Sequence, residues 1–584
     1  MQFAQVVVNT KTALKNQFFT YKIPPSLLAE IKIGCLVEVP FRNKMIEGIV
    51  WQLVKQSKFE KLKSIKKIIT PEVIANNFHR ELAVWMSQYY LEPLGKCLFT
   101  ILPPIPKRYA AKIPTIRDIE IFNNSTTYFF QGNRQERFNL YRKIVSKNLN
   151  DKIVVLFSSQ NQLNKFKKYL LNYQNINFHE NSPTSKKRFN QWFEILTRKP
   201  KLILGTRATI FDPIFNPKYI IIDEISGFSY KQEQSPRYHA ATIATKIAEM
   251  SKSKLILADE LPSAEIYQKI IEKKYRLLRI KSTHKIFPSI KIIDLKSQKN
   301  FISFPLQENI TAFLKQNKKI LLYVNRKGQG SNIICQDCKT IKLCPNCNLP
   351  LVAHLNDRKY RCHQCQYWEK ENAKCLKCAG TNTYYSGLGD EKIKEIAQKM
   401  FGKTKNISIG TKQILETDQK FDLVAVINLD NILNLPNPYS KEEVFRTIFR
   451  LKNIAKERLI IQTYLPKNYV FQNLNQPFNF LINELSLRKQ FGLPPFRKII
   501  KLILQNPDEK TAKQKIENLA KELINFKEVE LLGPNKKFIP QKRNQFLYQL
   551  VIKLPKDQNV FSLFSKLKKF TSNFKVDVDP IELI

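Results

Sequence analysis

Four C-x-x-C pairs stand close together in the middle of this chain, and they constrain its fold more than any other feature. Eight of the ten cysteines fall within CQDCKTIKLCPNCNLPLVAHLNDRKYRCHQCQYWEKENAKCLKC, residues 335–378. Two residues between thiolates let one tight turn present both sulfurs to a single ion, and two such turns complete a tetrahedral shell. We therefore expect two structural zinc ions with closed four-thiolate shells. The eight predicted ligands are Cys335, Cys338, Cys344, Cys347, Cys362, Cys365, Cys375 and Cys378.

The spacing leaves open which pairs share an ion. The inner pairs flank a hairpin-like segment, LPLVAHLNDRKYR, whereas the outer pairs flank the whole insertion. Nested pairing, inner with inner and outer with outer, would hold the stem of the insertion closed. Iron–sulfur ligation is an alternative, but its usual spacing is absent.

The net charge favours a polyanionic partner. Lys and Arg number 97 against 49 Asp and Glu, which gives +48 over 584 residues. A field of this sign attracts nucleic acid, although a biased genome composition would also enrich Lys, Ile and Asn. The N-terminus lacks the apolar core of a signal peptide, and no apolar run reaches the roughly 18 residues of a spanning helix. We expect a cytoplasmic, nucleoid-associated protein without membrane contact, whose thiols are not disulfide-bonded.

Alternating strand and helix signals predict a multidomain α/β chain. Residues 1–70 alternate apolar and polar positions between turn signals, which is typical of a small β domain. KIVVLFSS, KLILGTRATIF, YIIIDE and KLILAD alternate with helical stretches, which predicts a parallel sheet. A second such run starts at KKILLYVNRKG, is interrupted by the cysteine block, and resumes with ISIGTK, DLVAVINLD and ERLIIQTYLP. The C-terminal segment has an α+β pattern.

The strand YIIIDE ends in Asp223 and Glu224. A buried strand that delivers carboxylates to the C-terminal edge of a parallel sheet is typical of a Mg·ATP site. The same residues could instead cap the next turn. No G-x4-G-K-[ST] phosphate loop occurs in the sequence, which favours the second interpretation.

The order of these segments resembles that of the PriA family of replication-restart helicases over nearly the full length. FTYKIP, VEVPFRN and GIV are similar to its N-terminal 3′-DNA-binding domain, and WMSQYYLEPLGKCL to its winged helix. GTRATIF and DEISGFSYKQEQSPRYHA are similar to its first lobe, and LLYVNRKGQGSNIICQDC to the start of its second lobe. ELSLRKQFGLPPF and LLGPNKKF are similar to its C-terminal domain.

The resemblance implies two RecA-like lobes and a specific zinc pairing. One ion would bind Cys335, Cys338, Cys375 and Cys378, and the other Cys344, Cys347, Cys362 and Cys365. The implied domains are a 3′-DNA-binding-like β domain at 1–70, a winged-helix-like domain at 71–112, lobe 1 at 113–285, lobe 2 at 305–480 with its zinc-binding insertion at 333–380, and a C-terminal α+β domain at 481–584.

The family's phosphate loop is altered here. Where the family has G-V-T-G-S-G-K-T-E-V-Y, this chain has QGNRQERFNLY, residues 131–141. Arg137 takes the place of the phosphate-binding Lys, and Phe138 that of the Mg-binding Thr. Backbone N–H groups cradle phosphates only where Gly lets the loop curl closely around them, and Phe offers no side-chain oxygen.

The motifs of the second lobe are altered as well. The family's Q-V-A-G-R-A-G-R is RLKNIAKE here, residues 450–457, so that Ile454 and Glu457 replace its arginine fingers. An arginine finger typically contributes about 10³–10⁵ in rate. We expect ATP and Mg binding to be lost, and Asp223 and Glu224 to be a vestigial nucleotide site.

The residues to which the resemblance assigns DNA contact are closer to the family's pattern than the nucleotide-binding motifs are. SPRYHA is similar to the family's aromatic-rich loop near single-stranded DNA, in which Arg237 and Tyr238 would supply a phosphate contact and a stacking face. Arg207 in GTR is assigned a similar role. The alternative is a packed Tyr and a solvated Arg. Thr20 stands where the family's F-D-Y has a carboxylate associated with 3′-end recognition. We therefore expect general binding to DNA structure to be retained better than recognition of a 3′ terminus.

These features favour a monomeric, DNA-binding replication-restart protein that has lost its motor and recognises forked or branched DNA and single-stranded DNA. The resemblance implies the replicative helicase, its loader and the single-strand-binding protein as further partners in the primosome. One rival hypothesis is an active ATP-dependent 3′→5′ DNA helicase with divergent motifs, and the phosphate loop argues against it. The other rival is a zinc-bearing RNA- or ribosome-binding protein, which only the charge supports.

Overall fold

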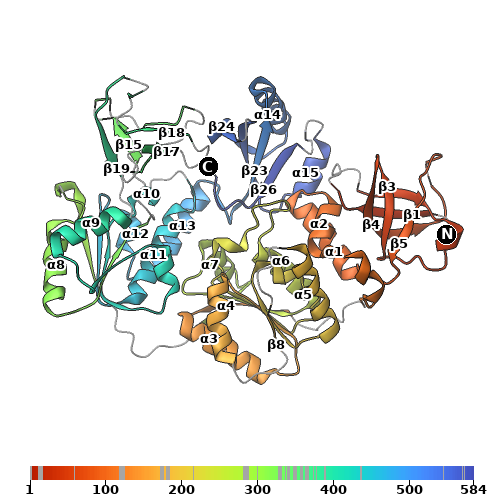
Figure 1. Ribbon diagram of the computed structural model, residues 1–584, viewed down its shortest axis with the longest axis horizontal. Coiled ribbons are helices and arrows are strands. Elements are labelled where there is room, and N and C mark those ends of the chain that lie inside the picture. The colour runs from red at the N-terminus through yellow and green to blue at the C-terminus, as the bar shows by residue number, and fades with distance from the viewer. Residues whose placement is uncertain are drawn as a thin grey trace.

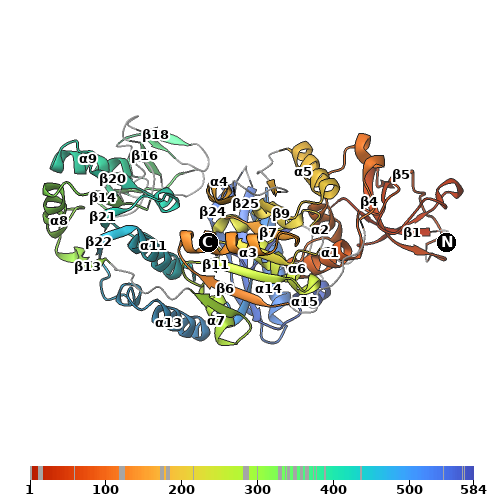
Figure 2. The ribbon, with the colours of Figure 1, turned by 90° about the horizontal axis from the view of Figure 1, so that it is seen from below.

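The computed structural model shows an elongated, multidomain α/β protein (Figure 1). The structure describes all residues except 1–2, 11–16, 58, 117–124, 171–175, 179–183, 215, 280–287, 299, 326–331, 336, 339–341, 346–350, 355–358, 362–366, 372–373, 376–377, 387–389, 434–436, 543–544, 568–569, 571–572 and 584. The N-terminal β domain and the second α/β lobe lie at opposite ends of the longest axis, with the first lobe and the C-terminal domain between them (Figures 1 and 2). Among the described residues, no helix combines the length and apolar character that a membrane crossing needs.

The N-terminal residues form the predicted β domain. Its antiparallel sheet has the order β2-β1-β4-β3-β5, and the apolar side chains that alternate along β1 and β3 fill its core. The strands are β1 (Phe3–Val8), β2 (Phe19–Lys22), β3 (Leu36–Phe41), β4 (Lys44–Val54) and β5 (Lys67–Thr70).

Residues 71–112 differ from the winged helix that we predicted. They form α1 (Asn77–Tyr90), α2 (Leu94–Ile101) and a 3₁₀ helix (Lys107–Lys112), with no strand that could make a wing. The apolar faces of α1 and α2 pack instead into one core with lobe 1 and the C-terminal domain, which includes Met86, Ile243 and Leu502. This segment therefore joins three parts of the chain.

Lobe 1 is a seven-stranded parallel sheet with the order β12-β6-β11-β10-β7-β9-β8. Its central strands are apolar on both faces because helices cover both sides, as expected for a parallel sheet. The strands are β6 (Thr127–Gln131), β7 (Ile153–Leu156), β8 (Ile176–Phe178), β9 (Leu202–Gly205), β10 (Tyr219–Asp223), β11 (Lys254–Asp259) and β12 (Arg276–Arg279). The α-helices are α3 (Arg134–Lys147), α4 (Gln160–Lys167), α5 (Ser185–Arg198), α6 (Ala240–Ser251) and α7 (Ala264–Ile271).

Lobe 2 is a five-stranded parallel sheet with the order β13-β22-β21-β14-β20. It begins at β13 and not at the predicted residue 305. Most of α13 lies beyond the predicted boundary at residue 480, but this helix packs on the core of lobe 2. The strands are β13 (Ser289–Asp294), β14 (Ile320–Tyr323), β20 (Ile407–Gly410), β21 (Phe421–Val426) and β22 (Ala455–Thr463). The α-helices are α8 (Phe304–Lys315), α9 (Asp390–Phe401), α10 (Asp430–Leu433), α11 (Ser440–Ile454), α12 (Tyr469–Gln472) and α13 (Pro477–Gln490).

The cysteine-rich insertion lies between β14 and α9 of lobe 2. Its antiparallel sheet has the order β18-β17-β16-β15-β19, and pairing of the first strand with the last closes the stem. The strands are β15 (Asn332–Cys335), β16 (Val352–His354), β17 (Lys359–Arg361), β18 (Trp368–Lys370) and β19 (Thr383–Ser386).

The C-terminal domain is an antiparallel sheet with the order β24-β25-β23-β26, covered by α14 (Glu509–Ile524) and α15 (Val560–Lys566). Its strands are β23 (Arg497–Asn506), β24 (Glu530–Lys542), β25 (Gln545–Pro555) and β26 (Phe574–Val578). Further 3₁₀ helices span Pro25–Leu27, Lys168–Leu170, Arg207–Phe211, Phe228–Tyr230, Leu295–Ser297 and Lys412–Glu416.

Candidate functional site

The segment that we aligned with the phosphate loop connects β6 to α3. Asn133 caps α3: its side chain accepts a hydrogen bond from the backbone N of Glu136 at 3.1 Å, and Oε2 of Glu136 accepts one from the backbone N of Asn133 at 2.7 Å. This capping box satisfies backbone donors at the helix end that a phosphate loop directs at its ligand, and it adds a carboxylate there. An anionic ligand would have to compete with Glu136 for this end of the helix.

Arg137 lies at the centre of a buried ion-pair cluster. Its side chain is fully excluded from solvent, and its Nε donates to Oδ1 of Asp223 at 2.6 Å. Its Nη2 donates to Oε1 of Glu224 at 3.1 Å, and its Nη1 to the carbonyl oxygen of Gly132 at 3.0 Å. The hydroxyl of Tyr141 donates to the same oxygen of Asp223 at 2.8 Å. The fold thus brings together residues 131–137 and the carboxylates that end β10.

The charges of this cluster stabilise one another. Burial opposes the charged form of Arg137, but Asp223 and Glu224 raise the pKa of its guanidinium group well above the ordinary value. Burial alone would raise the pKa of Glu224, but the guanidinium groups of Arg450 and Arg137 hold it below the ordinary value. A divalent cation that bound Oδ1 of Asp223 or Oε1 of Glu224 would have to displace the guanidinium group with which these oxygens are already paired.

Two details of this cluster bear on metal binding. Oδ2 of Asp223 is buried and has no hydrogen-bond partner within the described part of the chain. Phe138, aligned with the Mg-binding Thr, is 1% exposed, and its ring lies 5.2 Å from that of Phe166 and 5.4 Å from that of Tyr169. The position from which the family's loop would reach a metal therefore belongs to the core of lobe 1.

Lobe 2 reaches this site through two arginines of α11. Nη2 of Arg450 lies 3.4 Å from Oδ1 of Asp259, and Nη1 of Arg446 lies 3.5 Å from Oδ2 of the same carboxylate, which ends β11. Ser226 donates to Oδ2 of Asp259 from its hydroxyl at 2.6 Å and from its backbone N at 3.1 Å. Burial alone would raise the pKa of Asp259, but the arginines, with Arg450 foremost, hold it below the ordinary value.

Sequence reasoning missed these arginines because it considered only the two aligned finger positions. Ile454 packs on the core of lobe 2, and Glu457 pairs with Lys318 at 2.6 Å. The signal that could have found the arginines is a pair at positions i and i+4 of a helix, Arg446 and Arg450, in a lobe that faces strands ending in acids.

A second bridge between the lobes is centred on Asp418. Its carboxylate pairs with Arg134 at the start of α3, and its Oδ2 accepts from Nζ of Lys165 in α4 at 2.8 Å. Lys165 also donates to the carbonyl oxygen of Glu416 at 2.6 Å, and Arg134 donates to that of Leu415 at 3.0 Å. Charged groups of lobe 1 thus bind the segment that follows β20 of lobe 2.

The outer cysteine pairs form a metal-type site, as predicted. The Sγ atoms of Cys335, Cys338, Cys375 and Cys378 all lie within 4.8 Å of one another. The separation is 3.5 Å between Cys335 and Cys378, and 3.7 Å between Cys338 and Cys375. Four thiolates at about 2.3 Å from a tetrahedral zinc would lie about 3.8 Å apart, so these positions fit zinc.

The pairing of β15 with β19 produces this arrangement. Cys335 ends β15 opposite Thr383, so both outer C-x-x-C pairs lie at the base of the insertion. At Gly380 a Cβ atom would lie 1.9 Å from a carboxylate oxygen of Asp337. The absence of a side chain at Gly380 therefore lets the two outer C-x-x-C pairs approach each other. Of the inner ligands, Cys344 is buried, whereas Cys347, Cys362 and Cys365 lie outside the described residues. The second zinc site therefore stays a prediction.

The residues assigned to DNA contact lie around one loop of lobe 1. Nη1 of Arg207 donates to the carbonyl oxygens of Ser229 and Lys231 at 2.8 and 2.7 Å. Tyr238 is 4% exposed and packs edge-on against Phe211, with ring centroids 5.0 Å apart. Tyr238 is therefore packed in the protein, as in the alternative to DNA contact given above. Stacking on a base would require its ring to leave this position.

The remaining assigned residue, Arg237, faces the C-terminal domain. Its Nη1 lies 3.6 Å from Oδ2 of Asp577, and Nζ of Lys231 lies 2.9 Å from Oδ1 of the same carboxylate. Lys231 also donates to the backbone carbonyl of Val578 at 2.7 Å. The loop is therefore held by the C-terminal domain, and its role in DNA binding stays a prediction.

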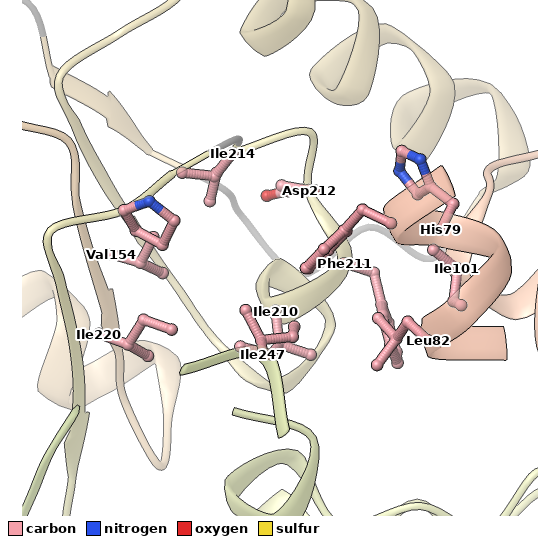
Figure 3. Close-up of a pocket in the computed structure, with 12 residues that line it drawn as sticks. His79, Leu82, Ile101, Val154, Ile210, Phe211, Asp212, Ile214, Ile220 and Ile247 are labelled. Carbon is pink, nitrogen blue, oxygen red and sulfur yellow. The ribbon is translucent and has the colours of Figure 1, made fainter. Parts of the chain in front are cut away.

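Two hollows lie where α1 meets lobe 1. Figure 3 shows the first, an apolar cavity of about 20 Å³ lined by Leu82, Ile210 and Ile247 among others, which has room for about one water molecule. The second is an open groove of about 380 Å³ between the β domain, α1 and α6. Arg80 lies over the ring of Trp51 at 5.6 Å, and Lys246 over that of Trp85 at 5.9 Å, so this groove carries cations and aromatic faces.

Known proteins are similar to this chain in sequence. Residues 5–103 match the 3'DNA-binding domain (3'BD) of PriA, and this match includes α1 and α2. Residues 344–370 match the PriA DNA helicase Cys-rich region (CRR) domain, and residues 489–581 the Primosomal protein N C-terminal domain. The chain is 28% identical to replication restart protein PriA of Rickettsia conorii, over 96% of this chain and 97% of that protein. It is 26% identical to that of Borreliella burgdorferi, over 95% of this chain and 93% of that protein.

Among solved structures, a DEAD box protein from Methanococcus jannaschii is similar with a TM-score of 0.28 and 12% identity, over 62% of this chain and 86% of that chain. The fold and the matches together define a multidomain protein with two parallel α/β lobes, a cysteine-rich zinc region, and a 3′-DNA-binding domain at its N-terminus. The chain belongs to the PriA replication restart protein family.

Proposed function

We propose that this protein binds branched DNA during replication restart and helps to reload the replisome without hydrolysing ATP. The observation that carries the proposal is the burial of Arg137 between Asp223 and Glu224. These are the groups that the family's fold would direct at phosphates and Mg²⁺, and in this chain they pair with one another.

ATP turnover needs a cradle for the phosphates, a metal ligand from the loop, and cations from the facing lobe. The capping box of Asn133 and Glu136 closes the helix end, and Phe138 is part of the core. The cations of lobe 2, including Arg450, are already directed at Asp259. At each of these three places a contact within the protein thus stands where ATP turnover would need a contact with nucleotide or metal.

The same contacts support a scaffold role. In a motor, nucleotide brings the cationic groups of one lobe to the other, and its release separates them. Here Asp259 binds Arg446 and Arg450, and Asp418 binds Arg134 and Lys165, so protein carboxylates join the lobes. We infer that the relative position of the lobes does not depend on ATP, and that DNA affinity is the same with and without it.

The DNA-binding side rests on charge and on the N-terminal domain. The net charge of +48 favours polyanions, and residues 5–103 match a 3'DNA-binding domain. The groove beside that domain adds Arg80 and Lys246 next to Trp51 and Trp85. Thr20 lacks the carboxylate associated with 3′-end recognition, so we propose a preference for branched structure over a 3′ terminus.

One observation favours an active helicase as the second candidate. Asp223 and Glu224 remain at the end of β10, and Oδ2 of Asp223 is free of hydrogen bonds within the described residues, so one oxygen is left for a metal. This candidate requires ATP and Mg²⁺ to open the ion pairs of Arg137.

Binding of labelled forked, duplex and single-stranded DNA, with and without ATP, tests the proposal. We expect the fork to bind more tightly than duplex, log K to fall linearly with log salt, and ATP to have no effect. Equal affinity for fork, duplex and heparin would reduce the interaction to non-specific charge. A change of DNA affinity on addition of ATP would favour the active helicase instead.

A further inference from the structure

The hairpin formed by β17 and β18 in the cysteine-rich insertion has two chemically different faces. In its antiparallel register Lys359 lies opposite Lys370, Tyr360 opposite Glu369, and Arg361 opposite Trp368. Because side chains alternate along a strand and directly opposed residues share a face, Tyr360 and Glu369 lie on one face. The other face carries one indole and three cationic side chains, those of Trp368, Lys359, Arg361 and Lys370.

The first of these faces is fixed to the rest of the insertion. Tyr360 is 1% exposed, and its hydroxyl lies 2.8 Å from Oγ1 of Thr383 in β19. Glu369 pairs with Lys342 at 3.0 Å, and Nζ of Lys342 lies 5.1 Å from the ring centroid of Tyr360. The hairpin is thus anchored through one face, and this anchorage determines the direction of the other.

The second face, which we call the platform, is open. Trp368 is 53% exposed, and Arg361 and Lys370 are also exposed. Nζ of Lys359 lies 4.4 Å from the ring centroid of Trp368. A half-exposed indole contributes little to the folding of a hairpin that is anchored elsewhere, whereas an aromatic face beside several cations is what proteins use to bind single-stranded nucleic acid.

We propose that the platform binds single-stranded nucleic acid, with a base stacked on Trp368 and phosphates near Lys359, Arg361 and Lys370. A base offers its flat face to a side chain only when it is unpaired or at the end of a stack, so the platform selects single strands over duplex. The charge excludes a cationic partner, and the aromatic face gives affinity that salt does not screen. This inference rests on the proposed DNA binding and assigns part of it to the insertion.

The test is binding of labelled oligo-dT and of a duplex to wild type, Trp368→Ala and Trp368→Phe, at the highest salt at which wild type still binds. Since stacking contributes about 1–3 kcal/mol per base, Trp368→Ala should weaken oligo-dT binding by roughly 5- to 150-fold. Duplex binding should stay unchanged, and Trp368→Phe should retain most of the affinity. Quenching of tryptophan fluorescence by oligo-dT should be reduced in Trp368→Phe.

Two controls show that any loss is local. Phe304→Ala removes an aromatic ring of lobe 2 that is 64% exposed, and it should leave oligo-dT binding unchanged. Zinc content of Trp368→Ala should equal that of wild type, which shows that the insertion remains folded.

Four results would overturn the assignment. Unchanged oligo-dT affinity in Trp368→Ala, in a wild type that binds forks, would refute the platform and leave the proposed function intact. Equal loss for oligo-dT and duplex would show a general effect of charge or folding. Loss of affinity for an acidic peptide but not for oligo-dT would make the platform a protein-docking surface. Absence of any DNA binding by wild type would refute the proposed function as well.

Discussion

The guanidinium group of Arg137 and the carboxylate of Asp223 lie 2.6 Å apart, 86 positions apart in the sequence, and both side chains are fully buried. Such a pair stabilises a protein little compared with an apolar pair of the same shape, but removing one partner leaves a buried charge without compensation. The pair therefore makes the core of lobe 1 dependent on both residues. It also means that the residues aligned with a nucleotide site act here in folding.

Removal of the Arg137 charge tests this structural role. Arg137→Met keeps the length of the side chain but removes the guanidinium group that pairs with Asp223 and Glu224, so we expect a loss of about 3–5 kcal/mol in the free energy of unfolding of lobe 1. Urea denaturation followed by circular dichroism measures the change. Adding Asp223→Asn to Arg137→Met should recover part of the loss. A single variant as stable as wild type would contradict the proposed role of the pair.

The contact between Arg450 and Asp259 should couple the lobes. We expect the effects of Arg450→Ala and Asp259→Asn on the free energy of unfolding to be non-additive. A double-mutant cycle should give an interaction free energy of about 0.5–3 kcal/mol, because the two side chains share one ion-pair network. Arg458→Ala, which removes an arginine over the ring of Phe313 in lobe 2, serves as the matched control and should show no coupling to Asp259→Asn. Strict additivity of Arg450→Ala and Asp259→Asn would show that the lobes are not joined through this pair.

Metal analysis should give two zinc ions per chain. Cys375→Ser removes a ligand of the outer site, where the four thiols already meet, and should leave one zinc on the inner cysteines. Cys344→Ser should leave one zinc on the outer site. Elemental analysis of wild type with a single zinc would eliminate the inner site, and iron in place of zinc would refute both assignments.

His239 should make stability depend on pH. Burial, together with Lys231 and Arg207, lowers its pKa from 6.5 to about 3, and its neutral Nδ1 accepts a hydrogen bond from the backbone N of Ala241 at the start of α6. Between these two values the unfolded chain binds a proton that the folded chain does not, so stability is full above pH 6.5 and falls as pH decreases toward 3. The thermal midpoint of wild type should fall more steeply over this range than that of His239→Gln. Parallel curves would contradict a buried, neutral His239.

The features that the sequence predicted well are those with a strong local signal. Three consecutive Ile before Asp223 favour a strand that is covered on both faces, and β10 is such a strand. The capping box at Asn133 and Glu136 could also have been read from the N-x-x-E spacing. Both depend on neighbours within a few residues.

The failures have a different physical origin. Arg446 meets Asp259 from 187 positions away, so no local pattern could show that contact. β13 is an edge strand with alternating exposure, SIKIID, and its weak apolar pattern placed the start of lobe 2 too late. In residues 71–112 the apolar spacing predicted the helices correctly, but the wing was inferred from resemblance alone and is absent there.

ATP hydrolysis by the purified chain, with and without forked DNA, tests the central claim most directly. We predict no hydrolysis above background and no stimulation by DNA. Arg137→Lys with Phe138→Thr should not restore it, because the capping box of Glu136 and the pairing of Arg450 with Asp259 remain. Hydrolysis by wild type that forked DNA stimulates and Asp223→Ala abolishes would contradict the account and show an active helicase.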